Sequence, residues 1–338
     1  MNLVLVTSFR TNNVLMYDDK GNFQGVFGEA NLFDSGLIHP RNIIADQNGN
    51  IYVSSFGTNQ VLKYDQKGQF LGEFAPVNGP VGLAFDSSGD LYIASYSDNK
   101  VLRYDLNGTL VDDQFIPSGD NGLLNVTGII FDQNDNLYVN YYGDFERINR
   151  GGVLKYDSSG NFIEVFTDYS EIHPDGSRLN GPYEIAFDDN SNYYISSLAP
   201  PYYVLHYEND GTPLGIFGEV NDIDTPDLSD PHGLIFDPNG DLLVTASTNS
   251  NILRFTSNGD SLGVFGEASN ALSLLDAPTD IVFTTSTFVT EKLKTPVYRF
   301  QNKDIPSTYL YAGEQEAQNI RQNYPNFKEE GFAFNVST

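Results

Sequence analysis

The chain of 338 residues contains no cysteine, and this absence excludes several kinds of chemistry at once. The protein cannot form disulfide bonds, use a thiolate nucleophile or hold zinc through sulfur ligands. Tryptophan is also absent, and only two methionines are present. Hydrophobic residues nevertheless make up 40% of the chain and aromatic residues 13%, so it can bury a sizeable core and is not compositionally disordered.

Basic residues are scarce. The chain has 18 Lys and Arg against 45 Asp and Glu, for a formal net charge of −27. This field repels phosphate backbones and anionic lipid surfaces, so we expect neither nucleic acid nor a membrane as a partner. Long hydrophobic runs are missing too, since no apolar stretch approaches the roughly 18–20 residues of a membrane span. We expect a monomer.

The apolar start of the chain, residues 1–6, has no basic n-region and no small-residue cleavage site. It therefore predicts a strand and not a signal peptide. A very acidic chain without cysteine is compatible with bacterial secretion by a route that needs no N-terminal signal. We predict an extracellular protein exported in this way, with a cytoplasmic protein as the alternative.

What the sequence does have is one phrase repeated five times. Residues 85–95 read FDSSGDLYIAS, and close variants include FDQNDNLYVNY and FDPNGDLLVTA. Its aspartate recurs about every 40 to 56 residues, at Asp46, Asp86, Asp132, Asp188 and Asp237. Each unit predicts four short strands, joined by turns in which Asp supplies a side-chain acceptor and Gly can adopt a positive φ. Four antiparallel strands in roughly 40–50 residues are typical of a β-propeller blade.

The chain opens in the middle of a blade. Residues 3–8 match the second strand of the unit, and no first strand precedes them. Residues 277–283 supply the missing strand from the other end. First strands begin at Pro40, Pro80, Val126, Pro182, Pro231 and Pro278. We therefore predict an all-β, six-bladed propeller of four-stranded antiparallel blades over residues 1–290, closed by an inner strand from the C-terminal side, which removes exposed strand edges.

Residues 80–108, PVGLAFDSSGDLYIASYSDNKVLRYDLNG, resemble the NHL repeat nearly position for position. The resemblance extends over about residues 1–283. It implies the propeller fold, but NHL-type propellers include lyases, hydrolases and modules that bind protein, RNA or sugar. One departure is consistent: the aspartate that usually closes the second strand is Ser55, Ser95 and Ser197 in three units and Asn140 in another.

Residues 291–338 do not continue the repeat, and we predict a small C-terminal module with one helix at about 314–324. Ala317, Ile320 and Tyr324 share a helical face, and Pro325 ends the pattern. The module resembles one of unknown function that occurs in secreted bacterial proteins. It is either a cap on the ring or a ligand-binding or cell-surface element.

The candidate binding site lies where the inner strands start. In related propellers ligands bind at this mouth of the channel, and the resemblance predicts glycine at the second place after the strand-opening proline. Asn42, Glu184 and Asp280 replace that glycine. Together with Arg41, Tyr183 and His232 they form a ring of converging polar groups, which indicates a ligand site. A solvated channel mouth would accept the same polar residues.

Two enzymatic alternatives follow from the resemblance. Calcium-dependent lactonases of related form use a central Glu/Asn/Asp set, and Asn42, Glu184 and Asp280 offer such oxygens, but the usual Glu-Gly-Pro opening is replaced by Asn-Gly-Pro at 78–80. Streptogramin-type lyases carry Pro-His-Gly at blade starts, and residues 231–233 match once. A catalytic function would rest on His232, Glu184 and Asp280.

Aromatic residues also follow the second strands, among them Tyr96, Tyr142 and Tyr202. Their faces suit a protein, peptide or carbohydrate ligand, although packing between blade loops would also explain them. We predict a non-catalytic binding propeller without a cofactor, acting through the channel mouth and these loops. A propeller lyase or hydrolase is the alternative, with calcium as its cofactor in the lactonase case.

Overall fold

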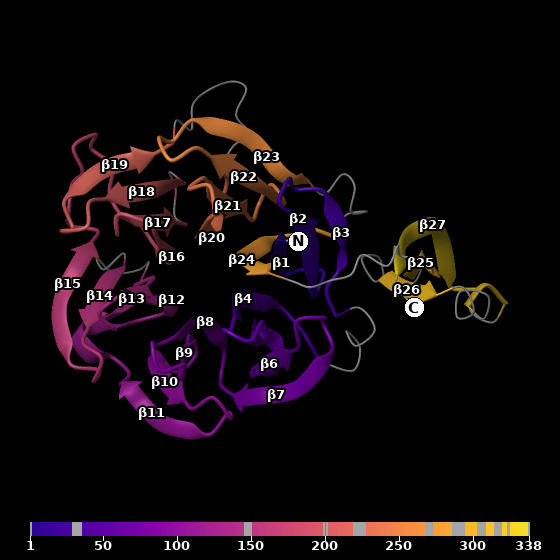
Figure 1. The fold of residues 1–338 in the computed structure, drawn as a ribbon, viewed down its shortest axis with the longest axis horizontal. Helices are drawn as coiled ribbons and strands as arrows, with labels where there is room; N and C mark the ends of the chain where they lie inside the picture. Colours follow the sequence, from indigo (N-terminus) through magenta and orange to yellow (C-terminus); the bar gives the residue numbers. More distant parts are fainter. Residues whose placement is uncertain are drawn as a thin grey trace.

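Six four-stranded antiparallel sheets form a closed ring in a computed structural model of the chain (Figure 1). The structure describes residues 2–28, 36–144, 151–198, 200, 202–218, 228–267, 274–285, 295–302, 309–313, 320–322 and 325–336. The predicted fold class is confirmed. We number the blades 1 to 6 along the chain, and each inner strand contacts the inner strand of the next blade around the ring.

The strands of the first three blades, from the inside outward, have the following bounds. They are β24 (Pro278–Thr285), β1 (Asn2–Ser8), β2 (Asn13–Asp18) and β3 (Phe23–Val26) in blade 1; β4 (Pro40–Ala45), β5 (Ile51–Ser55), β6 (Gln60–Tyr64) and β7 (Phe70–Pro76) in blade 2; and β8 (Pro80–Phe85), β9 (Leu91–Ser95), β10 (Lys100–Tyr104) and β11 (Leu110–Ile116) in blade 3. Two short 3₁₀ turns, η2 (Phe56–Thr58) and η3 (Asp120–Gly122), lie in connections.

The remaining blades follow the same order. They are β12 (Val126–Phe131), β13 (Leu137–Tyr141), β14 (Gly152–Tyr156) and β15 (Phe162–Asp168) in blade 4; β16 (Pro182–Phe187), β17 (Tyr193–Ser197), β18 (Tyr203–Tyr207) and β19 (Pro213–Phe217) in blade 5; and β20 (Pro231–Phe236), β21 (Leu242–Ala246), β22 (Asn251–Phe255) and β23 (Ser261–Glu267) in blade 6.

The ring closes as the sequence predicts. Inner strand β24 comes from the C-terminal side and pairs antiparallel with β1, so that Val4 lies opposite Phe283 and Val6 opposite Ile281. Blade 1 is therefore built from both ends of the propeller segment. Figure 1 shows β24 and β1 side by side at the inner edge of this blade. Such a closure couples the two ends of the ring, because neither can leave without breaking a four-stranded sheet.

The repeated phrase produces the turn between the first two strands of a blade. Asp86 Oδ1 accepts the backbone N–H groups of Ser88 and Asp90, each at 2.9 Å. Gly89 N donates to the Asp86 carbonyl oxygen at 3.0 Å, and its φ of +89° explains the glycine. The tyrosine of the phrase packs between blades: the fully buried Tyr52 meets Phe85 of the next blade edge-on, with ring centroids 5.2 Å apart.

The C-terminal region contains a three-stranded antiparallel sheet that the sequence analysis does not predict. Its strands are β25 (Thr295–Asn302), β26 (Tyr309–Gly313) and β27 (Phe327–Val336), with β25 in the middle. Figure 1 shows this sheet outside the ring. Residues 320–322 are helical, and the rest of the predicted helix at 314–324 lies outside the described residues, as does the predicted domain boundary at 290–291. In the described part of the chain, no helix is long and apolar enough to cross a membrane.

Candidate functional site at the channel mouth

Each inner strand begins with an irregularity that places the predicted mouth residues. In blade 2, Pro40 pairs with Ser55 but Ile43 pairs with Val53, so the inner strand carries one extra residue there. The same shift occurs in blades 3 to 6. A bulge of this kind bends the strand and redirects its side chains, here Arg41 and Asn42 in blade 2.

Hydroxyl groups of the second strands satisfy the amides that these bulges free. Asn42 N donates to Ser54 Oγ at 2.8 Å, and Glu184 N donates to Ser196 Oγ at 3.0 Å. Gly233 and Asp280 make the corresponding bonds to threonine hydroxyls. Ser54 and Ser196 stand one place before Ser55 and Ser197, the serines that the sequence analysis singled out in these blades. The sequence alignment of blade 4 was wrong by one residue. Val126 pairs with Tyr141 as Pro40 pairs with Ser55, so Tyr141 and not Asn140 is the equivalent of Ser55.

The three residues that replace glycine interlock around the axis. Asn42 Nδ2 donates to Glu184 Oε2 at 3.3 Å, and because blades 2 and 5 face each other in a ring of six, this bond crosses the channel. Asp280 Oδ2 accepts Ile43 N of the next blade at 2.8 Å, and Asn42 Oδ1 accepts Leu83 N of the blade after that at 3.2 Å. All three side chains are buried. These side chains therefore connect different blades of the ring through hydrogen bonds, and they do not line a solvated mouth.

Burial changes the protonation of the two central carboxyl groups. It raises the pKa of Asp280 to about 7, although the hydrogen bonds from Ile43 N and Ile281 N lower this pKa. Burial and then the negative charge of Asp280 raise the pKa of Glu184 well above its usual range. Two nearby carboxylates in a dry site resist carrying two charges. We therefore expect the Glu184–Asp280 pair to hold a proton near neutral pH.

His232 lies beside this cluster but does not join it. Its Nδ1 is 2.9 Å from the carbonyl oxygen of Asp230, and its ring meets the Tyr183 ring edge-on, with centroids 4.4 Å apart. Burial lowers the pKa of His232, so the ring is neutral and Nδ1–H donates to that carbonyl. Within the described residues, no hydrogen bond connects His232 to Glu184. The predicted pair of acid and base is therefore not assembled as a dyad in this structure.

Arg41 packs against two aromatic rings at the mouth. Its guanidinium carbon is 4.2 Å from the Phe9 ring centroid and 5.3 Å from that of Phe56. Burial raises the pKa of the Tyr183 hydroxyl, and the adjacent Arg41 charge acts in the opposite direction. A weak hydrogen bond from Arg41 to this hydroxyl acts in the same direction as the charge. Arg41 Nε and the Tyr183 hydroxyl are both buried, and neither has a well-aligned partner among the described residues.

The residue after the second strand lies at this same end of the channel in every blade. In blade 3, for example, Tyr96 N donates to the carbonyl oxygen of Gly79, just before the strand-opening proline. The corresponding residues of blades 1 to 4 are all aromatic and half-buried: Phe9, Phe56, Tyr96 and Tyr142. We call these four residues the aromatic rim. Sequence analysis missed Phe9, although its place after the second strand would have identified it.

Tyr142 links the aromatic rim to the blades beyond it. Burial and then the charge of Asp230 raise the pKa of Tyr142 to about 12, with smaller effects from Tyr96 and Tyr202. Asp230, Tyr96 and Tyr202 therefore lie near Tyr142, and Tyr202 is half-buried. Phe56 and Tyr96 are also neighbours, with ring centroids 6.3 Å apart. The structure thus brings the predicted tyrosines together at the mouth.

The predicted calcium ligands do not fit a calcium ion as they stand. Asn42 turns its amide nitrogen toward Glu184 and gives its oxygen to Leu83 N, while Asp280 Oδ2 accepts Ile43 N. Ca²⁺ takes six to eight oxygen ligands, and this set leaves few free. In the part of the chain that the structure describes, no three His, Asp or Glu side chains are grouped to hold a metal.

Comparison with known proteins shows structures of the same fold but identifies no family. No protein-family model matches the chain, and no curated protein sequence matches it. A chain of the nidogen/laminin complex superposes with a TM-score of 0.62 at 12% identity, covering 85% of this chain and 99% of that chain. Virginiamycin B lyase from Staphylococcus aureus gives 0.54 at 15% identity, covering 83% and 87%. A gluconolactonase from Xanthomonas campestris gives 0.55 at 15%, covering 73% and 83%. These likenesses show a propeller fold that binding proteins and enzymes share.

Proposed function

We propose that the protein is a non-catalytic binding module that recognises a protein or peptide partner at the channel mouth. The observation that carries the proposal is the aromatic rim, which extends over four successive blades and is half-buried. Aromatic side chains offer a large apolar area with few rotatable bonds, so they lose little entropy when a partner covers them. The nidogen/laminin neighbour is an example of this fold in a protein complex.

Arg41 gives the rim its chemical preference. The guanidinium is held by the rings of Phe9 and Phe56 and makes no ion pair with any residue that the structure describes. Arginine together with aromatic residues is the composition that dominates binding energy at protein interfaces. We infer that the partner presents a carboxylate or carbonyl oxygen to Arg41 and apolar side chains to the rim.

Replacing Arg41 tests the proposal. Peptides would be selected on the full chain from a phage-displayed random library, and we expect those that bind to carry an acidic residue next to apolar ones. Arg41→Ala should weaken their binding about tenfold or more, because a hydrogen bond to a charged group contributes roughly 1.5–3 kcal/mol. Fluorescence polarisation with the labelled peptides measures the affinity.

Lys63→Ala is the matched control. Lys63 also lies over an aromatic ring, 4.9 Å from the centroid of Tyr52, but it belongs to β6 and is not part of the mouth. It should bind the selected peptides as tightly as the parent protein does. An equal loss of affinity in both variants would overturn the protein-partner proposal in favour of nonspecific attraction. Selection of no peptide, with binding of neutral sugars at the mouth, would overturn it in favour of a carbohydrate ligand.

The lyase or hydrolase alternative has one observation in its favour. Burial raises the pKa of Asp280 to about 7 and that of Glu184 as well, and such perturbed carboxyl groups are common in acid–base catalysis. The absence of a hydrogen bond between His232 and Glu184 among the described residues counts against it. Incubation of the protein with virginiamycin B and with gluconolactone distinguishes the two functions: turnover that disappears in His232→Ala would replace the binding proposal with an enzymatic one.

A further inference from the structure

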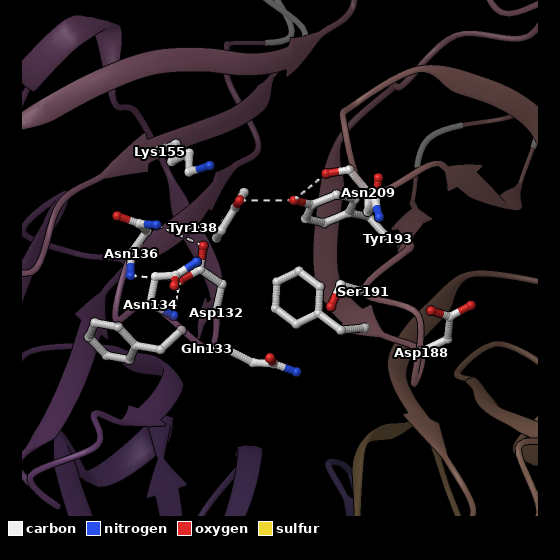
Figure 2. Close-up of a pocket in the computed structure, with 12 residues that line it drawn as sticks. Asp132, Gln133, Asn134, Asn136, Tyr138, Lys155, Asp188, Ser191, Tyr193 and Asn209 are labelled. Carbon is white, nitrogen blue, oxygen red and sulfur yellow. Dashed lines mark hydrogen bonds between the residues drawn. The ribbon is translucent and has the colours of Figure 1, made fainter.

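A cavity of about 330 Å³ lies between blades 4 and 5, beside the turns that join their first and second strands (Figure 2). Because the mouth is at the start of the inner strands and these turns follow their ends, the cavity opens on the opposite face of the ring. Phe131 and Phe187 contribute aromatic surface. Polar side chains from both blades complete the lining, chiefly Asp132, Asn136, Lys155, Ser191 and Asn209.

At this cavity, blade 5 has a tyrosine where the other blades have an aliphatic core residue. Tyr193 opens the second strand of blade 5, opposite Tyr207 of the third strand. In the other five blades the same register position holds an aliphatic residue: Val4, Ile51, Leu91, Leu137 or Leu242. A hydroxyl group therefore enters a region that is apolar elsewhere in the ring. Tyr193 is almost fully buried and lines the cavity.

Tyr193 changes the hydrogen bonds of its neighbour. In blades 2 and 3 the tyrosine of the second strand donates to the turn aspartate, as Tyr92 does to Asp86 at 3.2 Å. In blade 4 the hydroxyl of Tyr138 instead pairs with that of Tyr193 at 3.0 Å, and Tyr193 donates to the Asn209 carbonyl oxygen at 3.2 Å. Figure 2 shows this chain of hydrogen bonds along one side of the cavity. Asp132 Oδ2 accepts Asn136 Nδ2 at 2.8 Å but receives no tyrosine hydroxyl, whereas Asp46 Oδ2 accepts both Asn50 Nδ2 and the Tyr52 hydroxyl. Asp132 Oδ2 therefore keeps acceptor capacity that Asp46 Oδ2 uses.

Lys155 supplies a donor in the same cavity. Its ammonium is 5.0 Å from the Tyr138 ring centroid, and the carboxylate nearest to it belongs to Glu164, at 3.9 Å. The equivalent arginine of blade 3, Arg103, pairs closely with the turn residue Asp90 at 2.8 Å. Blade 4 has Asn136 in place of that aspartate. Lys155 therefore keeps donor capacity toward a ligand.

We propose that this cavity binds a neutral sugar of one or two rings. Asp132 and Asp188 disfavour an anion, and the Lys155 ammonium, which already lies over the Tyr138 ring, repels a second cation. Hydroxyl groups both donate and accept, so they can pair with a carboxylate, an amide and an ammonium in one site. The apolar face of a sugar ring suits Phe131 and Phe187. The volume is near the lower end of the roughly 300–1,000 Å³ typical of small-molecule pockets.

Saturation-transfer NMR on the full chain tests this inference, with glucose, galactose, mannose, N-acetylglucosamine, maltose and cellobiose as probes. We expect at least one sugar to bind. Tyr193→Leu should abolish or weaken that binding about tenfold or more, because it removes the hydroxyl and returns Tyr138 to Asp132. This variant should fold, since leucine holds the same position in blades 3, 4 and 6.

A matched pair of lysine variants separates the cavity from general effects. Lys155→Ala should weaken sugar binding, whereas Lys63→Ala, which removes a similarly stacked lysine from blade 2, should not. Sugar binding that is unchanged in both Tyr193→Leu and Lys155→Ala would overturn the assignment of the site. Binding of no sugar, or of tetramethylammonium or inorganic phosphate instead, would overturn the ligand class.

Discussion

Gly128→Ala is expected to destabilise the protein by about 3 kcal/mol or more. Gly128 stands at the second mouth position of blade 4, and a Cβ there would lie 2.4 Å from the carbonyl oxygen of Tyr183 and 2.7 Å from Glu184 Oε1. The first contact is with backbone, so relief requires the inner strands of blades 4 and 5 to separate. Glycine at this position therefore permits the close approach of neighbouring blades. Urea denaturation of the two proteins measures the difference.

Gly119→Ala is the control for this prediction. Gly119 has a φ of +76°, and a Cβ there would meet no atom within 4 Å. Its replacement should cost only about 1 kcal/mol, the expense of a left-handed conformation. If Gly128→Ala were no more harmful than Gly119→Ala, the inner strands would have more freedom than the close contacts indicate, and the view of the axis as a tightly interlocked ring would be wrong.

Asp280→Asn is expected to stabilise the protein at pH 8 and to have little effect at pH 4. The folded pKa of Asp280, about 7, lies above the unfolded value of 3.8. The folded state therefore binds the proton more tightly, and this contribution is lost as the pH rises from about 4 to about 7. A shift of this size corresponds to a loss on the order of 4 kcal/mol, shared with Glu184. Asparagine is neutral at every pH and can still accept the hydrogen bond from Ile43 N.

The test compares free energies of unfolding of parent and variant at several pH values. Burial lowers the pKa values of His232, His173 and His206, so these side chains reduce stability as the pH falls below 6.5 in parent and variant alike, and the difference between the two proteins isolates Asp280. Asp19→Asn, which removes a carboxylate from an exposed position, is the matched control. A difference that stays constant from pH 4 to pH 8 would show that Asp280 carries no raised pKa.

These two predictions bear on how the mouth works. Asn42 and Asp280 use their side chains for hydrogen bonds to neighbouring blades, so a ligand must contact other groups at the mouth. Arg41 and the aromatic rim are such groups. The proposed partner would then contact the rim, while the buried carboxyl pair sets the pH range in which the platform is stable.

Local chemistry explains why so much of the fold was predictable. An aspartate that accepts the amides two and four residues on, followed by a glycine with positive φ, specifies the same turn wherever it occurs, as at Asp86 and Gly89. The alternation of the strands and the spacing of the turns then predict four strands per blade. The absence of a first strand before residue 3 and its signal at 277–283 predicted the closure of the ring, which strand β24 at 278–285 makes.

The C-terminal sheet escaped prediction because its segments follow no repeat. A single short strand such as β26 (Tyr309–Gly313) has little periodicity of its own, and its pairing with β25 depends on contacts distant in sequence. The alignment error at Asn140 has a related cause. An inner-strand bulge shifts the partner of Tyr141 by one residue, and a bulge leaves little trace in the sequence of the opposite strand.

By itself, the sequence determined the blade, the number of blades and the residues that break the repeat at the mouth, because turns and alternation act between residues close along the chain. Only the tertiary structure decided what those residues do. The bond from Asn42 to Glu184 joins opposite blades, and the pairing of Tyr138 with Tyr193 joins adjacent ones. Such contacts depend on how the ring brings distant strands together, so no local sequence pattern could predict them.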